Sequence, residues 1–296
     1  MTDEQNKDTA ATDKQEASTA DQSSDAPDKV DLSSLSKRPL VEEIERNKDR
    51  YLSLISVTEE EKANASACPM KAVGFENNPY IAGDELQAVL IKFLPRHLLE
   101  NFQHAKKIVY FNKALRPKST AKGTIEDEEL TPEAAEREYI RTLAIKVHDE
   151  PFIRLFSPAG MSSERDVLRI ALVQATIHDI AHGIWDYHFD LAQSDNETVS
   201  QAALEWLNDL QELAYSGPAV SAKSQVYSDE SAERGKDFGQ EELAEMVRMY
   251  VFEHDRFKSS ATNGLGGHNK YEYTQALFTQ GNYRGHSVLP AVLPVS

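Results

Sequence analysis

The sequence predicts an α+β fold with a central buried helix, preceded by a disordered tail. Three observations support this prediction. Residues 1–39 contain almost no large apolar side chain. Segments rich in β-branched and aromatic residues alternate with helical segments between residues 81 and 156, as expected for strands among helices. From residue 163 onward, a long apolar pattern predicts a helix that is buried on most of its faces.

The composition narrows the classes of partner that we expect. The 296 residues include 49 acidic and 32 basic side chains, for a net charge of −17. Nucleic acids and anionic membrane surfaces repel such a chain, so we expect neither as a partner. The first residues carry charges and no apolar run, unlike a standard secretory signal peptide. We therefore expect a cytoplasmic protein, or one exported without such a signal, and composition says nothing of its oligomeric state.

Composition also divides the chain into three parts. Residues 1–39 cannot bury enough apolar surface to offset the entropy of ordering, so we predict a disordered acidic tail. Residues 40–80 are a lead-in, with a helix over 40–56 and an irregular stretch over 57–80. Residues 81–296 carry the periodic apolar patterns of a folded domain.

The elements of this domain are predicted from start signals, stop signals and periodicity. The first half contains helices beginning near Asp84 and Pro95, a strand over 107–115, a polar loop over 117–131, a helix opening at Thr131-Pro132, and the strands IRTLAIKV and PFIRLF around a turn at 148–151. The second half contains a long helix with a capping box at 163–166 and a terminator at Gly183, helices over 199–215 and 240–257, and a short helix in KYEYTQALF.

Two histidines in the long helix, His178 and His182, are the main chemical signal. Side chains four apart on a helix share one face, and two imidazoles there can reach one tetrahedral metal ion. A buried histidine otherwise needs partners for both ring nitrogens, so two structural histidines remain the alternative interpretation. The single Cys68 excludes a cysteine-built zinc cage. The spacing, together with the adjacent carboxylate of Asp179, favours a metal site.

A third ligand is available in the helix predicted over 240–257. Glu241 and Glu245 are again four apart and therefore share a face. One of them can bind the metal while the other accepts the N–H of a ligand histidine. A solvated acidic face is the alternative interpretation. The apolar residues of the same helix indicate that it is partly buried, which places its first glutamates at the border of a site.

These motifs resemble the gluzincin metallopeptidases, in particular the catalytic domain of anthrax lethal factor. In that family H-E-x-x-H is followed by an H-x-x-D-Y-like continuation, which resembles HGIWDY at residues 182–187. A later E-F-F-A-E-A-F segment resembles EELAEMV at 241–247, and an upstream L-P-x-x-L-L stretch before a strand resembles LPRHLL at 94–99. The resemblance covers roughly residues 80–280.

The resemblance implies a zincin-like fold and a zinc-dependent peptidase that acts on a peptide or protein. It assigns His178, His182 and Glu241 as zinc ligands and Glu245 as their support. Two positions depart from the family. Asp179 stands at the position where the family has its general-base Glu. Its carboxylate is one methylene shorter, so the second expected outcome is a site that binds its substrate without cleaving it. Arg234 stands where the family has an oxyanion-stabilising Tyr, and Tyr227 is the other candidate for that role.

Two further classes of function remain open. His178-Asp179 also resembles the dyad of HD-type phosphohydrolases, with His148 and Asp255 as its other ligands. We rank this second because Pro151 stops a helix where that fold needs one around His148. The third class is a non-enzymatic helical interaction protein, in which the histidines are structural and no metal binds.

Overall fold

The computed structural model describes residues 38–113, 115–119, 125–129, 143–148, 150–158, 162–221, 224–225, 238–261 and 264–289. All of them belong to one contact unit, Leu32–Ser296. The predicted tail lies outside the described residues, except that residues 38 and 39 begin a helix. The helix predicted at Thr131-Pro132 also lies outside them.

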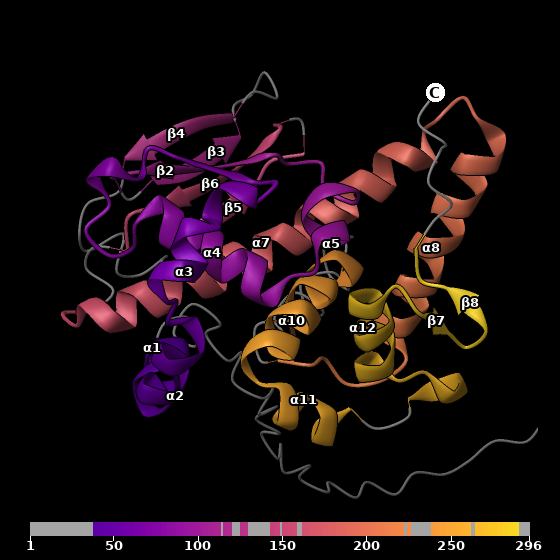
Figure 1. Cartoon of the computed structure of the whole chain (residues 1–296). Coiled ribbons are helices and arrows are strands. Elements are labelled where there is room, and N and C mark those ends of the chain that lie inside the picture. The colour runs from indigo at the N-terminus through magenta and orange to yellow at the C-terminus, as the bar shows by residue number, and fades with distance from the viewer. Residues whose placement is uncertain are drawn as a thin grey trace, which may run out of the picture. The chain divides into compact units, whose positions relative to one another are not determined.

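The chain combines many helices with a small sheet (Figure 1). Four strands form the sheet in the order β1 (Lys71–Val73), β2 (Lys107–Phe111), β6 (Phe152–Phe156) and β5 (Ala144–Lys146). The first three are parallel, and β5 runs antiparallel to β6 at one edge. Alternating or continuous apolar residues face the core from β2 and β6. The strands predicted in 107–115, IRTLAIKV and PFIRLF are confirmed.

Five α-helices precede the strands β5 and β6 in the described part of the chain, and the longest helices, α7, α8 and α10, follow them. The first group is α1 (Arg38–Arg46), α2 (Lys48–Ile55), α3 (Glu59–Ala63), α4 (Gly83–Phe93) and α5 (Arg96–Glu100), with the 3₁₀ turns Ala65–Ala67 and Phe75–Asn77. The second is α7 (Arg165–Ala192), α8 (Glu197–Tyr215), α10 (Phe238–Phe252), α11 (His254–Ser260) and α12 (Lys270–Thr279), with a 3₁₀ turn at Leu265–Gly267.

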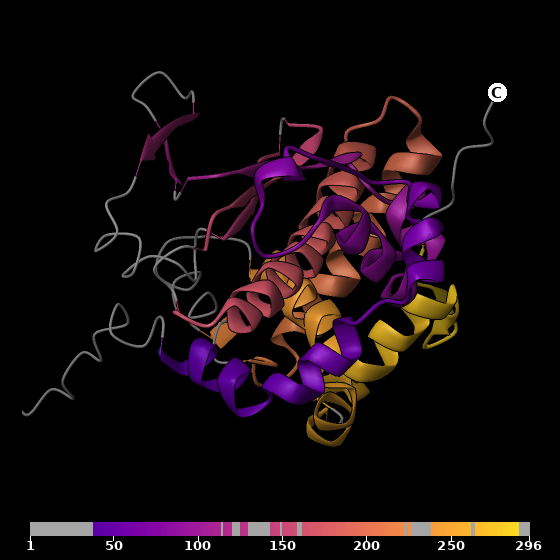
Figure 2. The ribbon, with the colours of Figure 1, turned by 60° about the vertical axis from the view of Figure 1, so that its left-hand side comes forward.

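Helix α7 is the centre of the fold, as its apolar sequence predicts. It contacts β5 and β6 on one side and α8 and α10 on the other, and α1 and α2 also pack on it. Figures 1 and 2 show it between the sheet and α10. Most of its residues are buried, including the polar His178, Asp179 and Asp186. Side chains from α7 and α10 therefore meet in the interior, at the interface between these two helices.

The predicted limits of α7 are both wrong. Its first residue is Arg165, and Glu164 before it makes no side-chain cap, so the predicted capping box does not form. The helix also continues through Gly183 for nine more residues, to Ala192. Gly183 does not end the helix, and the reason for a glycine at this position is close packing. An added Cβ there would lie 2.2 Å from Oε1 of the buried Gln103.

Four other predictions need correction. The helix predicted over 40–56 is broken at Asn47 into α1 and α2, and the one over 240–257 is broken at Glu253 into α10 and α11. The stretch 57–80 contains α3, which opens with a capping box between Thr58 and Glu61, and strand β1. The predicted loop over 117–131 contains most of an antiparallel hairpin, β3 (Leu115–Ser119) with β4 (Ile125–Glu129).

The helices predicted in 199–215 and KYEYTQALF are confirmed as α8 and α12. The two strands Asn282–Tyr283 (β7) and His286–Ser287 (β8) follow α12.

Candidate metal centre

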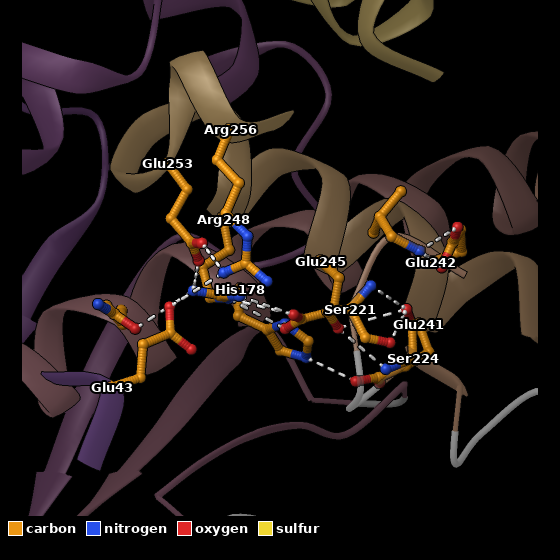
Figure 3. A network of polar contacts seen from close by, with 12 residues as sticks. Glu43, His178, Ser221, Ser224, Glu241, Glu242, Glu245, Arg248, Glu253 and Arg256 are labelled. Carbon is orange, nitrogen blue, oxygen red and sulfur yellow. Dashed lines mark hydrogen bonds and ion pairs between the residues drawn. The ribbon is translucent and has the colours of Figure 1, made fainter. Parts of the chain in front are cut away.

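Helices α7 and α10 bring His178, His182 and Glu241 together. The two histidines lie one turn apart on α7, and Glu241 lies in the first turn of α10. Figure 3 shows His178 beside Glu241 and Glu245. His178 and Glu241 are each only 4% exposed, so their polar atoms are removed from bulk water. One ligand atom from each of the three residues lies within 4.8 Å of the others. This buried group could hold a metal ion, and in the described part of the chain it is the one such group.

The spacing of the donor atoms matches a tetrahedral site. The Nε2 atoms of His178 and His182 are 3.2 Å apart. The Glu241 carboxylate lies 3.2 Å from Nε2 of His178 and 3.4 Å from Nε2 of His182. In a tetrahedral site with bonds of about 2.0–2.1 Å, neighbouring ligand atoms are roughly 3.3–3.4 Å apart. Oε1 of Glu241 is the oxygen near His178 and Oε2 is the one near His182, so the three side chains converge on one point with donor spacings close to those of a tetrahedral site.

Glu245 contacts His178 at the ring nitrogen Nδ1. Its Oε1 lies 3.0 Å from Nδ1 of His178, so the carboxylate contacts one ring nitrogen while the other, Nε2, faces the remaining candidate ligands. Arg248 in turn donates to Glu245 through Nε and a terminal nitrogen at 3.0–3.2 Å. Burial alone would lower the pKa of Arg248, but the carboxylates of Glu245 and Glu253 raise it above its ordinary value. Arg248 therefore places a positive charge beside the Glu245 carboxylate.

The structure describes only one of the three other predicted site residues. Asp179 follows His178 on α7 and is 5% exposed, so a carboxylate is buried next to the first ligand. Tyr227 and Arg234, the candidates for oxyanion stabilisation, lie outside the described residues.

Glu242, the neighbour of Glu241, belongs to a different network. Its carboxylate lies 2.5 Å from Nζ of Lys270 and accepts from the backbone N–H of Val220.

A second polar cluster lies one and two turns beyond His182 on α7. The carboxylate of Asp190 lies 2.8 Å from Nε2 of His104 and 3.2 Å from Nε2 of His148. Asp186 lies 3.2 Å from both Nδ1 of His148 and Nζ of Lys146. Sequence reasoning missed this cluster. The available signal was the four-residue spacing of the two aspartates, which continues that of the histidines.

Two histidines singled out by the sequence take structural positions. His148 binds the aspartates just described, and Asp255, its predicted companion in an HD-type site, is exposed on α11. The metal-binding group of the described residues includes neither. His188 on α7 is the second of these structural histidines. Its ring is fully buried and stacks on Trp206 at 3.6 Å between centroids. Burial lowers its pKa to about 3.

Comparison with known proteins adds no family assignment. No protein-family model, no curated protein and no solved structure matches the chain. The likeness to the gluzincins therefore consists of short motifs in their sequence order. Across the described residues, none of the helices has both the length and the hydropathy needed to span a bilayer.

Proposed function

We propose that this chain is a zinc-dependent metallopeptidase that acts on a peptide or protein, with Asp179 in the position of the general base. The observation that carries the proposal is the convergence of two Nε2 atoms and one carboxylate at tetrahedral spacing, with Glu245 behind the first histidine. The order of the gluzincin-like motifs along the chain supports the same assignment.

The donor set favours zinc. Two neutral imidazoles and one carboxylate form a three-residue set that catalytic zinc sites use, with a fourth position open for water or substrate. Calcium and magnesium prefer sites built from oxygen atoms, which two imidazoles do not provide. Zinc at such a position supplies Lewis acidity toward a peptide carbonyl and toward water.

The chain's own residues supply proton transfer and orientation. Asp179, buried directly after His178, is the carboxylate available to take a proton from an attacking water and return it to the departing amine. Glu245 fixes the tautomer and the ring orientation of His178 through Nδ1. Arg248 donates to Glu245 and holds its carboxylate in place.

The position of β5 supports an extended peptide as substrate. This strand packs against α7 and is the last strand of the sheet, since in the described part of the chain it pairs with β6 alone. An edge strand presents backbone N–H and C=O groups that an extended peptide can bind as an added strand. Such a peptide would lie along the sheet beside the metal-binding helix.

Metal content is the first test. Elemental mass spectrometry should find about one zinc per chain in the wild type and in Glu272→Ala, which removes an exposed glutamate on α12. His178→Ala and Glu241→Ala should lose the zinc while circular dichroism shows that they remain folded. Zinc retained in both variants, or no metal in a folded wild type, would overturn the proposed site, and the latter would favour an interaction protein.

Asp255→Ala distinguishes the phosphohydrolase. Zinc binding should survive this substitution, because Asp255 is exposed on α11 and lies outside the metal-binding group. Iron or manganese that is lost with Asp255 would contradict the peptidase and support an HD-type enzyme. Cleavage of a mixture of quenched-fluorescence peptides by the zinc-loaded wild type, abolished in Glu241→Ala, then tests the activity itself.

A further inference from the structure

A pocket of about 500 Å³ lies where α1 and α2 meet the start of α11. This volume falls in the range of small-molecule sites, roughly 300–1,000 Å³. Three arginines from three helices surround it, together with two glutamates and a tyrosine. These residues are Arg46, Arg50, Arg256, Glu43, Glu253 and Tyr51. An arginine-rich pocket is unexpected in a chain whose net charge is −17.

Two of these arginines have no acidic partner among the described residues. Nε of Arg46 donates to the backbone carbonyl of Glu42 at 3.1 Å. A terminal nitrogen of Arg50 donates to the carbonyl of Phe252 at 2.6 Å, and the guanidinium lies 5.0 Å from the centre of the Tyr51 ring. Both groups are thereby held at the pocket by neutral partners. Their positive charges and their remaining N–H groups stay available to a ligand.

The two glutamates of the pocket are already occupied by other groups. Glu253 accepts from Arg248 at 3.0 Å and from Arg256. Glu43 accepts from the Tyr51 hydroxyl at 3.3 Å and lies 3.6 Å from Arg256. Burial, and next the charge of Glu253, raises the pKa of Glu43 above its usual range. The glutamates therefore oppose an anion less than their number suggests.

We propose that this pocket binds a small anion that carries phosphate groups, held by Arg46, Arg50 and Arg256. Guanidinium groups bind phosphate oxygens through paired N–H donors, and those of Arg46 and Arg50 donate to backbone carbonyls while the two glutamates contact Arg256. The volume leaves room for more than a single phosphate, which points to a di- or triphosphate or a phosphorylated metabolite.

A chain of ion pairs links the pocket to the candidate metal centre, and all of its members except the exposed Arg256 are buried. Arg256 binds Glu253, Glu253 binds Arg248, Arg248 binds Glu245, and Glu245 binds His178 (Figure 3). An anion that draws Arg256 toward itself leaves Glu253 to rely more on Arg248. Arg248 then neutralises Glu245 less, and the Glu245 carboxylate accepts more strongly from Nδ1 of His178. A stronger acceptor makes that imidazole a better ligand, so the anion should tighten metal binding.

Binding can be measured without any metal. Isothermal titration of the metal-free full chain with inorganic pyrophosphate should show saturable binding near one site per chain. Arg46→Gln/Arg50→Gln should weaken it by at least about tenfold, the loss of two charge-assisted bonds. Arg165→Gln, an exposed arginine at the start of α7, is the matched control and should bind like the wild type. Absence of saturable binding, or an equal loss in Arg165→Gln, would overturn the pocket.

The link to the metal is a second step and rests on the proposed zinc site. Sulfate replaces pyrophosphate here because it is a tetrahedral dianion that chelates zinc weakly. Competition with a chromophoric chelator should show zinc bound about fivefold more tightly at saturating sulfate in the wild type, and no change in Arg46→Gln/Arg50→Gln. Unchanged wild-type affinity would disprove the link. Absence of zinc binding would instead contradict the proposed function, and the titration in metal-free protein would still test the pocket.

Discussion

At the scale of single residues, the proposed peptidase activity depends most on Asp179. Its carboxylate is one methylene shorter than that of a glutamate, yet it is buried directly beside the first histidine of the candidate centre. We expect Asp179→Asn to lower peptide cleavage by about 10²–10⁴, the usual contribution of a general base, and to keep its zinc. Asp179→Glu should retain or raise the activity. Rates on a quenched-fluorescence peptide, with zinc content measured beside them, test this.

The matched control for that series is Asp166→Asn, which removes an exposed carboxylate from the first turn of the same helix. Its rate and zinc content should equal those of the wild type. Wild-type activity in Asp179→Asn would show that this carboxylate takes no proton in the reaction. Activity in none of the proteins, with zinc bound in all of them, would leave Asp179 in a site that binds without cleaving.

The sequence predicts part of the site at this scale, because spacing along one helix fixes which side chains share a face. The pair His178 and His182 follows from this rule alone. The choice between Glu241 and Glu242 does not follow from this rule, since both residues are acidic and both are buried. The structure turns Glu242 to Lys270 and Val220, which come from distant parts of the chain. The role of Arg248 likewise depends on Glu253, after a helix break that no sequence signal marks.

At the scale of elements, α7 shows why a glycine in a helical pattern was misinterpreted. Gly183 is buried in the middle of the helix, where the segment around Gln103 approaches its backbone. The backbone N–H of His104 donates to the carbonyl of Gly183 at 3.1 Å, and Nε2 of Gln103 donates to the carbonyl of Ile180 at 2.8 Å. A side chain at position 183 would displace the Gln103 amide. The glycine permits this close approach and does not end the helix.

We therefore expect Gly183→Ala to destabilise the protein by about 1–3 kcal/mol, the usual cost of overpacking. In an ordinary helix interior the same change stabilises by about 1 kcal/mol. Urea denaturation in the Gln103→Ala background provides the control. Without the amide, Gly183→Ala should become neutral or stabilising. An equal loss in both backgrounds would show that Gln103 is not the obstacle.

The elements differ in how well the sequence predicts them, and the reason is burial. β2, β5, β6, α8 and α12 bury apolar residues, and the regular spacing of those residues predicted each of them. The hairpin β3–β4 was missed because its strands LRPKS and IEDEE carry charges and little apolar pattern. Ion pairs hold it to the rest of the chain instead, between Asp127 and Arg154 and between Glu129 and Lys113.

At the scale of the whole molecule, the position of α7 in the core affects stability as well as chemistry. The same central helix that holds the candidate ligands also buries His188 against α8. That ring stacks on Trp206, and its Nδ1–H donates to the carbonyl of Ile184 at 2.7 Å. Its Nε2 has no hydrogen-bond partner in the described part of the chain. A protonated imidazole would be desolvated there without compensation, which is the physical reason for its low pKa.

The stability of the fold should therefore fall in mild acid. Burial lowers the pKa of His188 from 6.5 to about 3, so between these values the unfolded chain binds more protons than the folded one. The contribution is complete above pH 6.5 and decreases as the pH falls, reaching a loss of about 2 kcal/mol at pH 5. Urea denaturation of metal-free protein at pH 7 and pH 5 should show this extra loss in the wild type and not in His188→Phe. His286→Phe, which removes an exposed histidine, should behave like the wild type. Equal pH dependence in the wild type and His188→Phe would contradict the prediction, because the other histidines titrate alike in both.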